Sequence, residues 1–251
     1  MPDPILEIDH LSHEFAGGSG IHDINFQVCA GEFILLAGPN GSGKTTLIRH
    51  LNALERPSSG GIRLYGRPVT ANLMLTRKTI GMVFQDADTQ IVGDTVAEEV
   101  AFGLENLNTP RAQIREKVDQ TLARINLSHL KDRNPATLSG GEKRRLAIAG
   151  ILVMDPEIIV LDEPFANLDY PASRHLVETI CRLNRDGQTI IVATHDVEEV
   201  ITLASRLLIL DDQGRLVRDG CPAELLGCLD RFGIREPCFS RMGYTAPPWQ
   251  T

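Results

Sequence analysis

The chain contains the stretch Gly38-Pro39-Asn40-Gly41-Ser42-Gly43-Lys44-Thr45-Thr46, which has the form G-x-x-x-x-G-K-[ST]. It follows the apolar run 33–37, which reads as a buried strand, and precedes the helix-like segment 47–52. Glycines allow successive backbone N–H groups to curl around phosphate oxygens, and a helix start adds unpaired donors. We therefore expect Lys44 to meet the β- and γ-phosphates of a nucleotide and Thr45 to ligate Mg²⁺. The alternative is a glycine-rich turn that contains a lysine by chance, and the strand–loop–helix context disfavours it.

The bulk composition fits one sizeable α/β domain with room for a subdomain. The chain has 251 residues, of which 42% are hydrophobic and 23% are charged, as in an ordinary globular protein. The net charge of −8 disfavours a nucleic-acid partner, which usually demands a basic face. The densest basic triplet is Lys143-Arg144-Arg145, and we expect it to be a solvated helix face rather than a site for an acidic partner.

Cysteine usage and hydropathy bear on the cellular compartment. The five cysteines have no C-x-x-C spacing and no nearby histidine pairs, which disfavours zinc and fits reduced thiols in the cytosol. The opening Met1-Pro2-Asp3-Pro4 does not resemble a signal peptide. No apolar run approaches the length of a bilayer span. We therefore expect any membrane contact to be made through partners.

Apolar strands alternate with helical segments along most of the chain, which predicts a parallel sheet covered on both faces. We expect strands at 5–15, 21–28, 33–37, 61–66, 80–85, 158–162 and 189–194, and a closing hairpin at 206–210 and 215–220. We expect helices between 95 and 152, at 171–185 and near 197–204.

Single positions refine the helical region. Ile114, Val118, Leu122 and Ile125 recur at helical spacing, and we interpret this stripe as core packing. Pro110 is expected in the first turn of that helix, and Ser139 is expected to cap the next one. After about residue 229 the chain looks irregular. It contains Pro237, Pro247, Pro248 and Trp249, to which we assign no role.

Two acids end the apolar run 158–161. In open α/β sheets ligands bind at the carboxyl ends of the strands, and this is where Asp162 and Glu163 stand. Asp162 is placed to hold Mg²⁺, directly or through water. Glu163 points elsewhere and is a candidate general base for an attacking water. Near a phosphate loop this reading is favoured over two acids that merely end a strand.

A second candidate anion site is Ser139-Gly140-Gly141, which follows Leu138 and precedes Glu142 at a helix start. A chain with one phosphate loop does not need a second segment of its own to bind the phosphates of the same nucleotide. We therefore expect this segment to contact a nucleotide held by another protomer. By itself the motif is weak, because a plain helix cap has the same letters.

Together these motifs, in this order, resemble the nucleotide-binding domain of an ATP-binding cassette (ABC) transporter, from Phe15 to about Leu226. The resemblance implies ATP and Mg²⁺ as ligands. It implies that Phe15 stacks on adenine and that Gln85 senses Mg²⁺ and the attacking water. It also implies that His195, which follows an apolar strand, contacts the γ-phosphate as a switch.

The same resemblance assigns the remaining positions. Ser139, Gly140 and Gly141 match the signature that closes over the partner's ATP, and Asp169 belongs to the loop Asn167-Leu168-Asp169 that communicates between two sites. Glu142 stands where glutamine is commoner, a change we expect to be neutral. The implied catalytic residues are Glu163, His195 and Gln85, and the implied Mg²⁺ ligands are Thr45, Gln85 and Asp162.

Two longer segments narrow the resemblance. Residues 84–92 with 95–103, and residues 141–150, are similar to the ATPase subunits of energy-coupling factor and cobalt-type importers. Those subunits are implied to pair, as homo- or heterodimers. They bind a transmembrane T-type coupling subunit near the glutamine loop, act with a substrate-binding membrane subunit, and power uptake of vitamins or Co²⁺/Ni²⁺. The chain departs from the subgroup at Asp86-Ala87, where Asn-Pro is usual, and at Phe165-Ala166-Asn167.

The resemblance implies a P-loop NTPase fold, with a RecA-like parallel sheet, an N-terminal antiparallel β subdomain and an inserted helical subdomain at about 90–155. The nucleotide-binding domain is expected at 1–230, with a tail at 231–251, and the protein is expected at the cytoplasmic face of the membrane. The alternatives are an ATPase of another ABC subgroup, a soluble ABC ATPase of translation or DNA repair, and a module that holds ATP without hydrolysing it.

Overall fold

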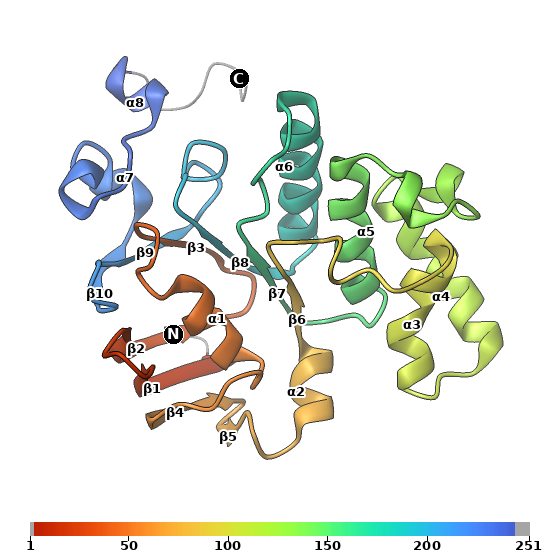
Figure 1. Cartoon of the computed structure of the whole chain (residues 1–251), viewed down its shortest axis with the longest axis horizontal. Coiled ribbons are helices and arrows are strands. Elements are labelled where there is room, and N and C mark those ends of the chain that lie inside the picture. Colours follow the sequence, from red (N-terminus) through yellow and green to blue (C-terminus); the bar gives the residue numbers. More distant parts are fainter. Residues whose placement is uncertain (1–2, 244–251) are drawn as a thin grey trace.

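A six-stranded sheet forms the centre of the computed structural model, which describes residues 3–243 (Figure 1). The strand order is β10-β9-β3-β8-β7-β6. The bounds are β3 Phe33–Ala37, β6 Ile80–Val83, β7 Ile158–Asp162, β8 Thr189–Thr194, β9 Arg206–Leu210 and β10 Leu216–Gly220. All neighbours pair in parallel except β9 and β10, which form the expected hairpin.

The central strands are apolar on both faces because both faces are covered. In β3, Phe33 and Leu35 belong to one core cluster, whereas Ile34 and Leu36 belong to another. Alternate side chains of a strand point to opposite faces, so the two clusters are the two sides of the sheet. The prediction of a parallel sheet covered on both sides is confirmed.

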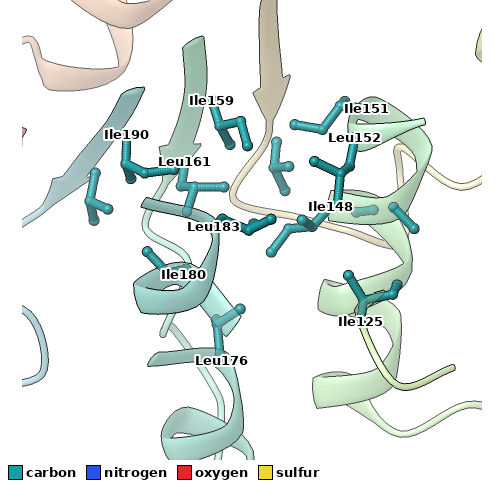
Figure 2. Close-up of a cluster of buried hydrophobic side chains, with 14 of the residues drawn as sticks. Ile125, Ile148, Ile151, Leu152, Ile159, Leu161, Leu176, Ile180, Leu183 and Ile190 are labelled. Carbon is teal, nitrogen blue, oxygen red and sulfur yellow. The ribbon is translucent and has the colours of Figure 1, made fainter. Parts of the chain in front are cut away.

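One face of the sheet carries α5 (Gly140–Leu152) and α6 (Tyr170–Arg185). Figure 2 shows their apolar side chains, such as Ile148 and Ile180, pointing toward Ile159 and Leu161 of β7. The opposite face carries α1 (Lys44–Leu51) and a separate antiparallel sheet of order β2-β1-β4-β5. The strands of that sheet are β1 Leu6–Glu14, β2 Gly20–Val28, β4 Ser59–Leu64 and β5 Arg67–Pro68, and α2 (Leu73–Thr79) leads from it to β6.

A helical region lies to one side of the sheet and consists of α3 (Val96–Asn106), α4 (Arg111–Arg124) and α5 (Figure 1). Short 3₁₀ turns, η1 (Ser128–Leu130) and η2 (Pro135–Thr137), join α4 to α5. The predicted stripe at 114, 118, 122 and 125 is buried, as expected for core packing. The placement of Pro110 was wrong. Its ψ of 137° is extended, so it precedes α4 as the N-cap residue.

The helix predicted near 197–204 is also wrong. Residues 198–203 form consecutive turns, with Val200 N–H and Ile201 N–H both donating to Val197 O. All three side chains are buried. Apolar residues at this spacing suit a helix, but a compact turn also buries them, and periodicity alone does not distinguish the two.

The tail is ordered over its described part, which corrects the expectation of an irregular segment. After α7 (Pro222–Leu225), the tail contains η3 (Leu229–Phe232) and α8 (Cys238–Arg241). Ile234 and Phe239 enter the core. The buried carboxylate of Glu236 accepts hydrogen bonds from Gly227 N–H (2.6 Å) and Leu229 N–H (3.2 Å). Pro247, Pro248 and Trp249 lie outside the described residues.

Candidate functional site

The phosphate-loop stretch connects β3 to α1, at the carboxyl ends of the parallel strands. Gly41 and Gly43 have φ values of 84° and 90°, which side-chain-bearing residues rarely adopt. A Cβ on Gly43 would stand 2.4 Å from Cγ2 of Ile21 on β2. Gly43 is the N-cap of α1 and has no side-chain cap, so the first N–H groups of this helix stay available to an anion.

Lys44 lies inside this loop. Its side chain is 6% exposed, and Nζ donates to Gly38 O (2.8 Å) and Pro39 O (3.0 Å). Burial lowers the pKa of Lys44, while Glu163 and Asp162 oppose that shift. The ammonium is 4.0 Å from Glu163 Oε1. A buried cation therefore stands between the loop and the acidic strand end.

Asp162, the first acid of the pair, contacts Thr45, which is also a predicted Mg²⁺ ligand. Asp162 ends β7 and is buried, and its Oδ1 accepts a hydrogen bond from Thr45 Oγ1 at 3.3 Å. Burial raises the pKa of Asp162, and the hydrogen bond from Thr45 opposes this shift. A hydroxyl and a carboxylate oxygen at this distance form a hard donor set that fits Mg²⁺.

Glu163 adopts an uncommon backbone conformation, with φ of 43°. Its side chain is held by three donors. Oε1 accepts from His195 N–H (3.0 Å) and lies 2.9 Å from His195 Nδ1, and Oε2 accepts from Thr194 Oγ1 (2.8 Å). Residues other than glycine that adopt the left-handed backbone conformation are concentrated at functional sites, where surrounding contacts hold them in place. The two candidate catalytic residues, Glu163 and His195, are therefore in direct contact.

A cavity of about 370 Å³ opens at this junction. It is lined by Asn40, Gly41, Gly43, Lys44, Thr45, Thr46, Gln85, Glu163 and His195. Three other predicted residues contact this lining. Asp162 accepts a hydrogen bond from Thr45, and the carbonyl oxygens of Gly38 and Pro39 accept hydrogen bonds from Lys44. Ser42 is buried beside Gly38. The structure thus brings the phosphate loop, both acids, the glutamine and the histidine together.

The Ser139 segment is not part of that cavity. Ser139 is the N-cap of α5, and its Oγ accepts from Glu142 N–H (3.3 Å). Glu142 returns the bond, because its Oε2 accepts from Ser139 N–H (2.7 Å) and Oγ–H (2.8 Å), and these bonds lower the pKa of Glu142. Gly140 lines a second cavity of about 430 Å³ that also reaches Gln85.

Two further predicted residues lie apart from the phosphate loop. Asp169 is the N-cap of α6, and its Oδ1 accepts from Ala172 N–H at 2.9 Å. Phe15 follows β1 and is 45% exposed, with its ring 4.5 Å from that of His13. An exposed aromatic ring is available for stacking on a base.

Arg144 is a residue that the sequence analysis misjudged. It was expected on a solvated face, but it is buried, and its guanidinium donates to Phe84 O (2.9 Å) and Gln85 O (2.6 Å). Burial lowers the pKa of Arg144. Lys143 of the same triplet pairs with Asp88 at 2.5 Å. Arg144 therefore fixes the backbone that carries Gln85, and a run of three cations gave no signal that one of them is buried.

Replacing Arg144 with methionine is expected to destabilise the protein. The change retains an apolar stem but leaves the carbonyls of Phe84 and Gln85 without a charged donor, and one such hydrogen bond contributes about 1.5–3 kcal/mol. For a chain of this size the melting temperature should fall by roughly 3–12 °C. Scanning calorimetry of nucleotide-free protein measures it. Lys143→Met is the matched control, because its exposed ion pair contributes about 0–1 kcal/mol; equal shifts in the two variants would contradict the anchoring role.

An apolar groove of about 440 Å³ lies between α2, α3 and α5. Met74 and Phe102 line it although they are 65% and 50% exposed. Glu99 also lines it, and its buried carboxylate accepts hydrogen bonds from Val92 N–H and Gly93 N–H at 2.7 and 2.8 Å. This anchor holds the segment between the glutamine loop and α3 against the groove.

Both the sequence and the fold of the chain match known proteins. The family described as "ABC transporter" matches residues 21–166. The energy-coupling factor transporter ATP-binding protein EcfA of Methanocaldococcus jannaschii is 40% identical over 225 residues, which cover 88% of this chain and 80% of that protein. EcfA of Methanococcus maripaludis is 40% identical, over 88% of this chain and 81% of its own length. The structure of cbiO1 from Clostridium perfringens, described as part of the ABC transporter complex cbiONQ, aligns with a TM-score of 0.83 and 34% identity, over 96% and 99% of the two chains.

Proposed function

Because the chain belongs to the ABC transporter family of ATP-binding proteins, we propose that it hydrolyses ATP to power an energy-coupling factor importer for a vitamin or a transition-metal ion. The observation that carries this proposal is the cavity in which Lys44, Glu163 and His195 converge on the phosphate loop. A steady-state phosphate-release assay with ATP and Mg²⁺ tests it. Binding of ATP without phosphate release would favour the rival function of a module that only holds the nucleotide.

Within this site each residue has a stated task. The N–H groups of the loop and the Lys44 ammonium bind the phosphates, because both present donors to the same concave space. Glu163 accepts a proton from the attacking water, and His195 keeps the carboxylate oriented through the 2.9 Å contact. Thr45, Asp162 and Gln85 would hold Mg²⁺, which supplies charge neutralisation at the transferring phosphoryl group.

Replacing Asp162 with asparagine tests the proposed metal site. Asparagine can still accept the hydrogen bond from Thr45, but it removes a negative charge from the donor set. Turnover should fall about 100-fold, because a catalytic metal contributes several kcal/mol of transition-state stabilisation. The melting temperature of the nucleotide-free protein should rise at neutral pH. The raised pKa means that the folded chain favours the protonated acid, so ionised Asp162 subtracts from stability there.

Both measurements are made on the same preparation, by phosphate release at varied Mg²⁺ and by scanning calorimetry without nucleotide. Thr46→Ser is a suitable control, since it lines the cavity and retains its hydroxyl. Full Mg²⁺-dependent turnover in the asparagine variant would show that Asp162 is not a ligand.

The site requires a second chain. Gly140, which stands between Ser139 and Gly141 at the N-terminus of α5, lines a different cavity from the one at Lys44. We propose that two subunits pair head to tail, so that this segment of one chain closes over the ATP of the other. Each composite site then combines Lys44 and Glu163 of one protomer with Ser139 of its partner. The chain carries both halves, so a homodimer suffices, and a paralogous partner fits the same geometry.

The proposed membrane partners are a T-type coupling subunit and a substrate-binding subunit. No helix within residues 3–243 is long and apolar enough to cross a bilayer. We propose that the groove at Met74 and Phe102 receives a segment of the coupling subunit, because two exposed apolar side chains there border the loop that leads from Gln85. The protein would then lie at the cytoplasmic face of the membrane.

Replacing Phe102 with aspartate should abolish co-purification with membrane proteins, since it places a charge in an apolar interface. The variant and the parent are extracted from detergent-solubilised membranes and their partners are identified by mass spectrometry. Met242→Asp is the matched control, because Met242 is 73% exposed and lies outside the groove. Recovery of the parent only in the salt-washed soluble fraction would favour the rival of a soluble ABC ATPase. The substrate-binding subunit recovered with the parent would identify the cargo.

A further inference from the structure

Two histidines face one another beneath the antiparallel sheet, away from the phosphate cavity. His13 lies on β1, and His50 lies in the last turn of α1 and is 1% exposed. Nδ1 of His13 is 3.3 Å from Nε2 of His50, and the two rings are at 63° to each other. Neither ring has a role in the proposed hydrolysis. Their sequence separation of 37 positions hides the pair from any inspection of spacing.

The hydrogen bonds of His50 determine which of its nitrogens is free. Nδ1 lies 2.7 Å from the carbonyl oxygen of Thr46, so this nitrogen carries the proton and donates it. Nε2 therefore presents a lone pair toward His13. A ring N–H bonded to a backbone carbonyl, with the opposite nitrogen free, is the usual arrangement of a metal-ligating histidine.

The distance between the rings matches a tetrahedral metal ion. Two nitrogens that each lie about 2.0–2.1 Å from a tetrahedral Zn²⁺ stand about 3.3–3.4 Å apart. The observed 3.3 Å separation equals this spacing. Nδ1 of His13 also lies 3.0 Å from the carbonyl oxygen of Arg56, which accepts a hydrogen bond from a protonated Nδ1 when no metal is bound. With that proton moved to Nε2 of His13, both facing nitrogens present lone pairs.

Glu55 supplies the third donor. One ligand atom from each of His13, His50 and Glu55 lies within 4.8 Å of those of the other two. Oε1 of Glu55 is paired with Arg49 at 3.3 Å. Its Oε2 is buried and accepts no hydrogen bond from the described part of the chain. An orphaned buried carboxylate oxygen is costly, and a cation is a natural partner for it.

We propose that His13, His50 and Glu55 bind a divalent transition-metal ion, with Zn²⁺ fitting best. Two imidazoles and one carboxylate form a donor set of the type preferred by Zn²⁺, whereas Mg²⁺ and Ca²⁺ prefer oxygen alone. The half-buried position of His13 leaves the fourth coordination position accessible to water. The ion would connect β1 to the helix that follows the phosphate loop.

This connection has a consequence that rests on the proposed function. The His13 ring contacts Phe15, the proposed adenine platform, at 4.5 Å. Fixing His13 on a metal ion would restrict that contact, so zinc should change ATP affinity without taking part in hydrolysis. Metal binding itself is measured without nucleotide, so its failure is distinguishable from failure of the ATPase assignment.

The test is a zinc titration of the full chain, freed of metal by a chelator, against a competing chromogenic chelator. We expect one Zn²⁺ per chain. His13→Gln and Glu55→Gln should each lower the zinc affinity by more than tenfold, because even outer-shell changes cost about 10–100-fold. His50 is left unchanged, since replacing a buried side chain would also disturb the packing of α1. Zinc should also raise the melting temperature of the parent but not that of His13→Gln.

His175→Gln is the matched control, because His175 is exposed on α6, and it should bind zinc like the parent. Substitution by Co²⁺ adds a spectroscopic readout, since tetrahedral nitrogen and oxygen ligation gives visible bands without thiolate charge transfer. Thiolate bands, or unchanged zinc affinity in His13→Gln, would place the metal elsewhere. No zinc binding by the parent would reduce the pair to two hydrogen-bonded histidines.

Discussion

Glu163→Gln will bind ATP like the parent but will release phosphate about 10²–10⁴ times more slowly, the range attributed to a positioned general base. Glutamine has nearly the same shape, so Oε1 can still accept the bond from His195 N–H that the carboxylate accepts now. It lacks the negative charge needed to take a proton from water. If ATP closes the proposed pair of subunits and hydrolysis reopens it, the variant should accumulate as a closed dimer. Phosphate release measures the first effect, and size-exclusion chromatography with ATP and Mg²⁺ measures the second.

The control for this prediction is Glu157→Gln. Glu157 lies just before β7 and bonds the Tyr65 hydroxyl on the surface, far along the strand from the cavity. It should hydrolyse ATP at the parent rate and should not accumulate as a dimer. Turnover by Glu163→Gln at the parent rate would remove Glu163 from the role of base.

Lys44→Ala will lose ATP affinity. The ammonium now donates to Gly38 O and Pro39 O, and phosphate oxygens would present stronger acceptors in the same loop. A hydrogen bond between charged groups contributes about 1.5–3 kcal/mol, and its loss corresponds to a dissociation constant that is about 10 to 150 times larger. Titration with a fluorescent ATP analogue measures this constant directly, without any need for turnover.

Lys78→Ala is the control for Lys44, because Lys78 lies on α2 beside the apolar groove and not at the phosphate loop. It should bind the nucleotide with the parent constant. If Lys44→Ala also retained the parent affinity, the phosphate loop would have been misread. Circular dichroism of both variants excludes unfolding as the reason for any loss.

The sequence predicted the elements whose pattern has a single physical solution. A continuous apolar strand such as β7 belongs in a doubly covered sheet, and the family match and the fold comparison confirm the ABC-type ATPase fold and its energy-coupling factor relatives. The separation of Ser139 from the phosphate cavity also followed from the presence of one phosphate loop. The roles of the individual site residues and the domain boundaries stay predictions.

Other features depend on contacts that distant segments make in space. Arg144 is buried because the backbone of Phe84 and Gln85 folds over α5, and three adjacent cations do not show which one is covered. The ordered tail depends on Glu236, whose carboxylate holds the backbone at Gly227. The composition of the tail suggested an irregular segment, because nothing in the sequence around Gly227 or Glu236 indicates that the two residues are bonded.

The separation of Ser139 from the cavity at Lys44 has a genetic consequence. On the proposed pairing, two identical chains with a defect at Lys44 would have both composite sites damaged at the phosphate loop. Two identical chains with a defect at Ser139 would have both sites damaged at the segment that the partner contributes. A mixed pair that contains one chain of each sort concentrates both lesions in one site and leaves the other intact. On this proposal, two defective alleles would complement each other, although neither would support transport by itself.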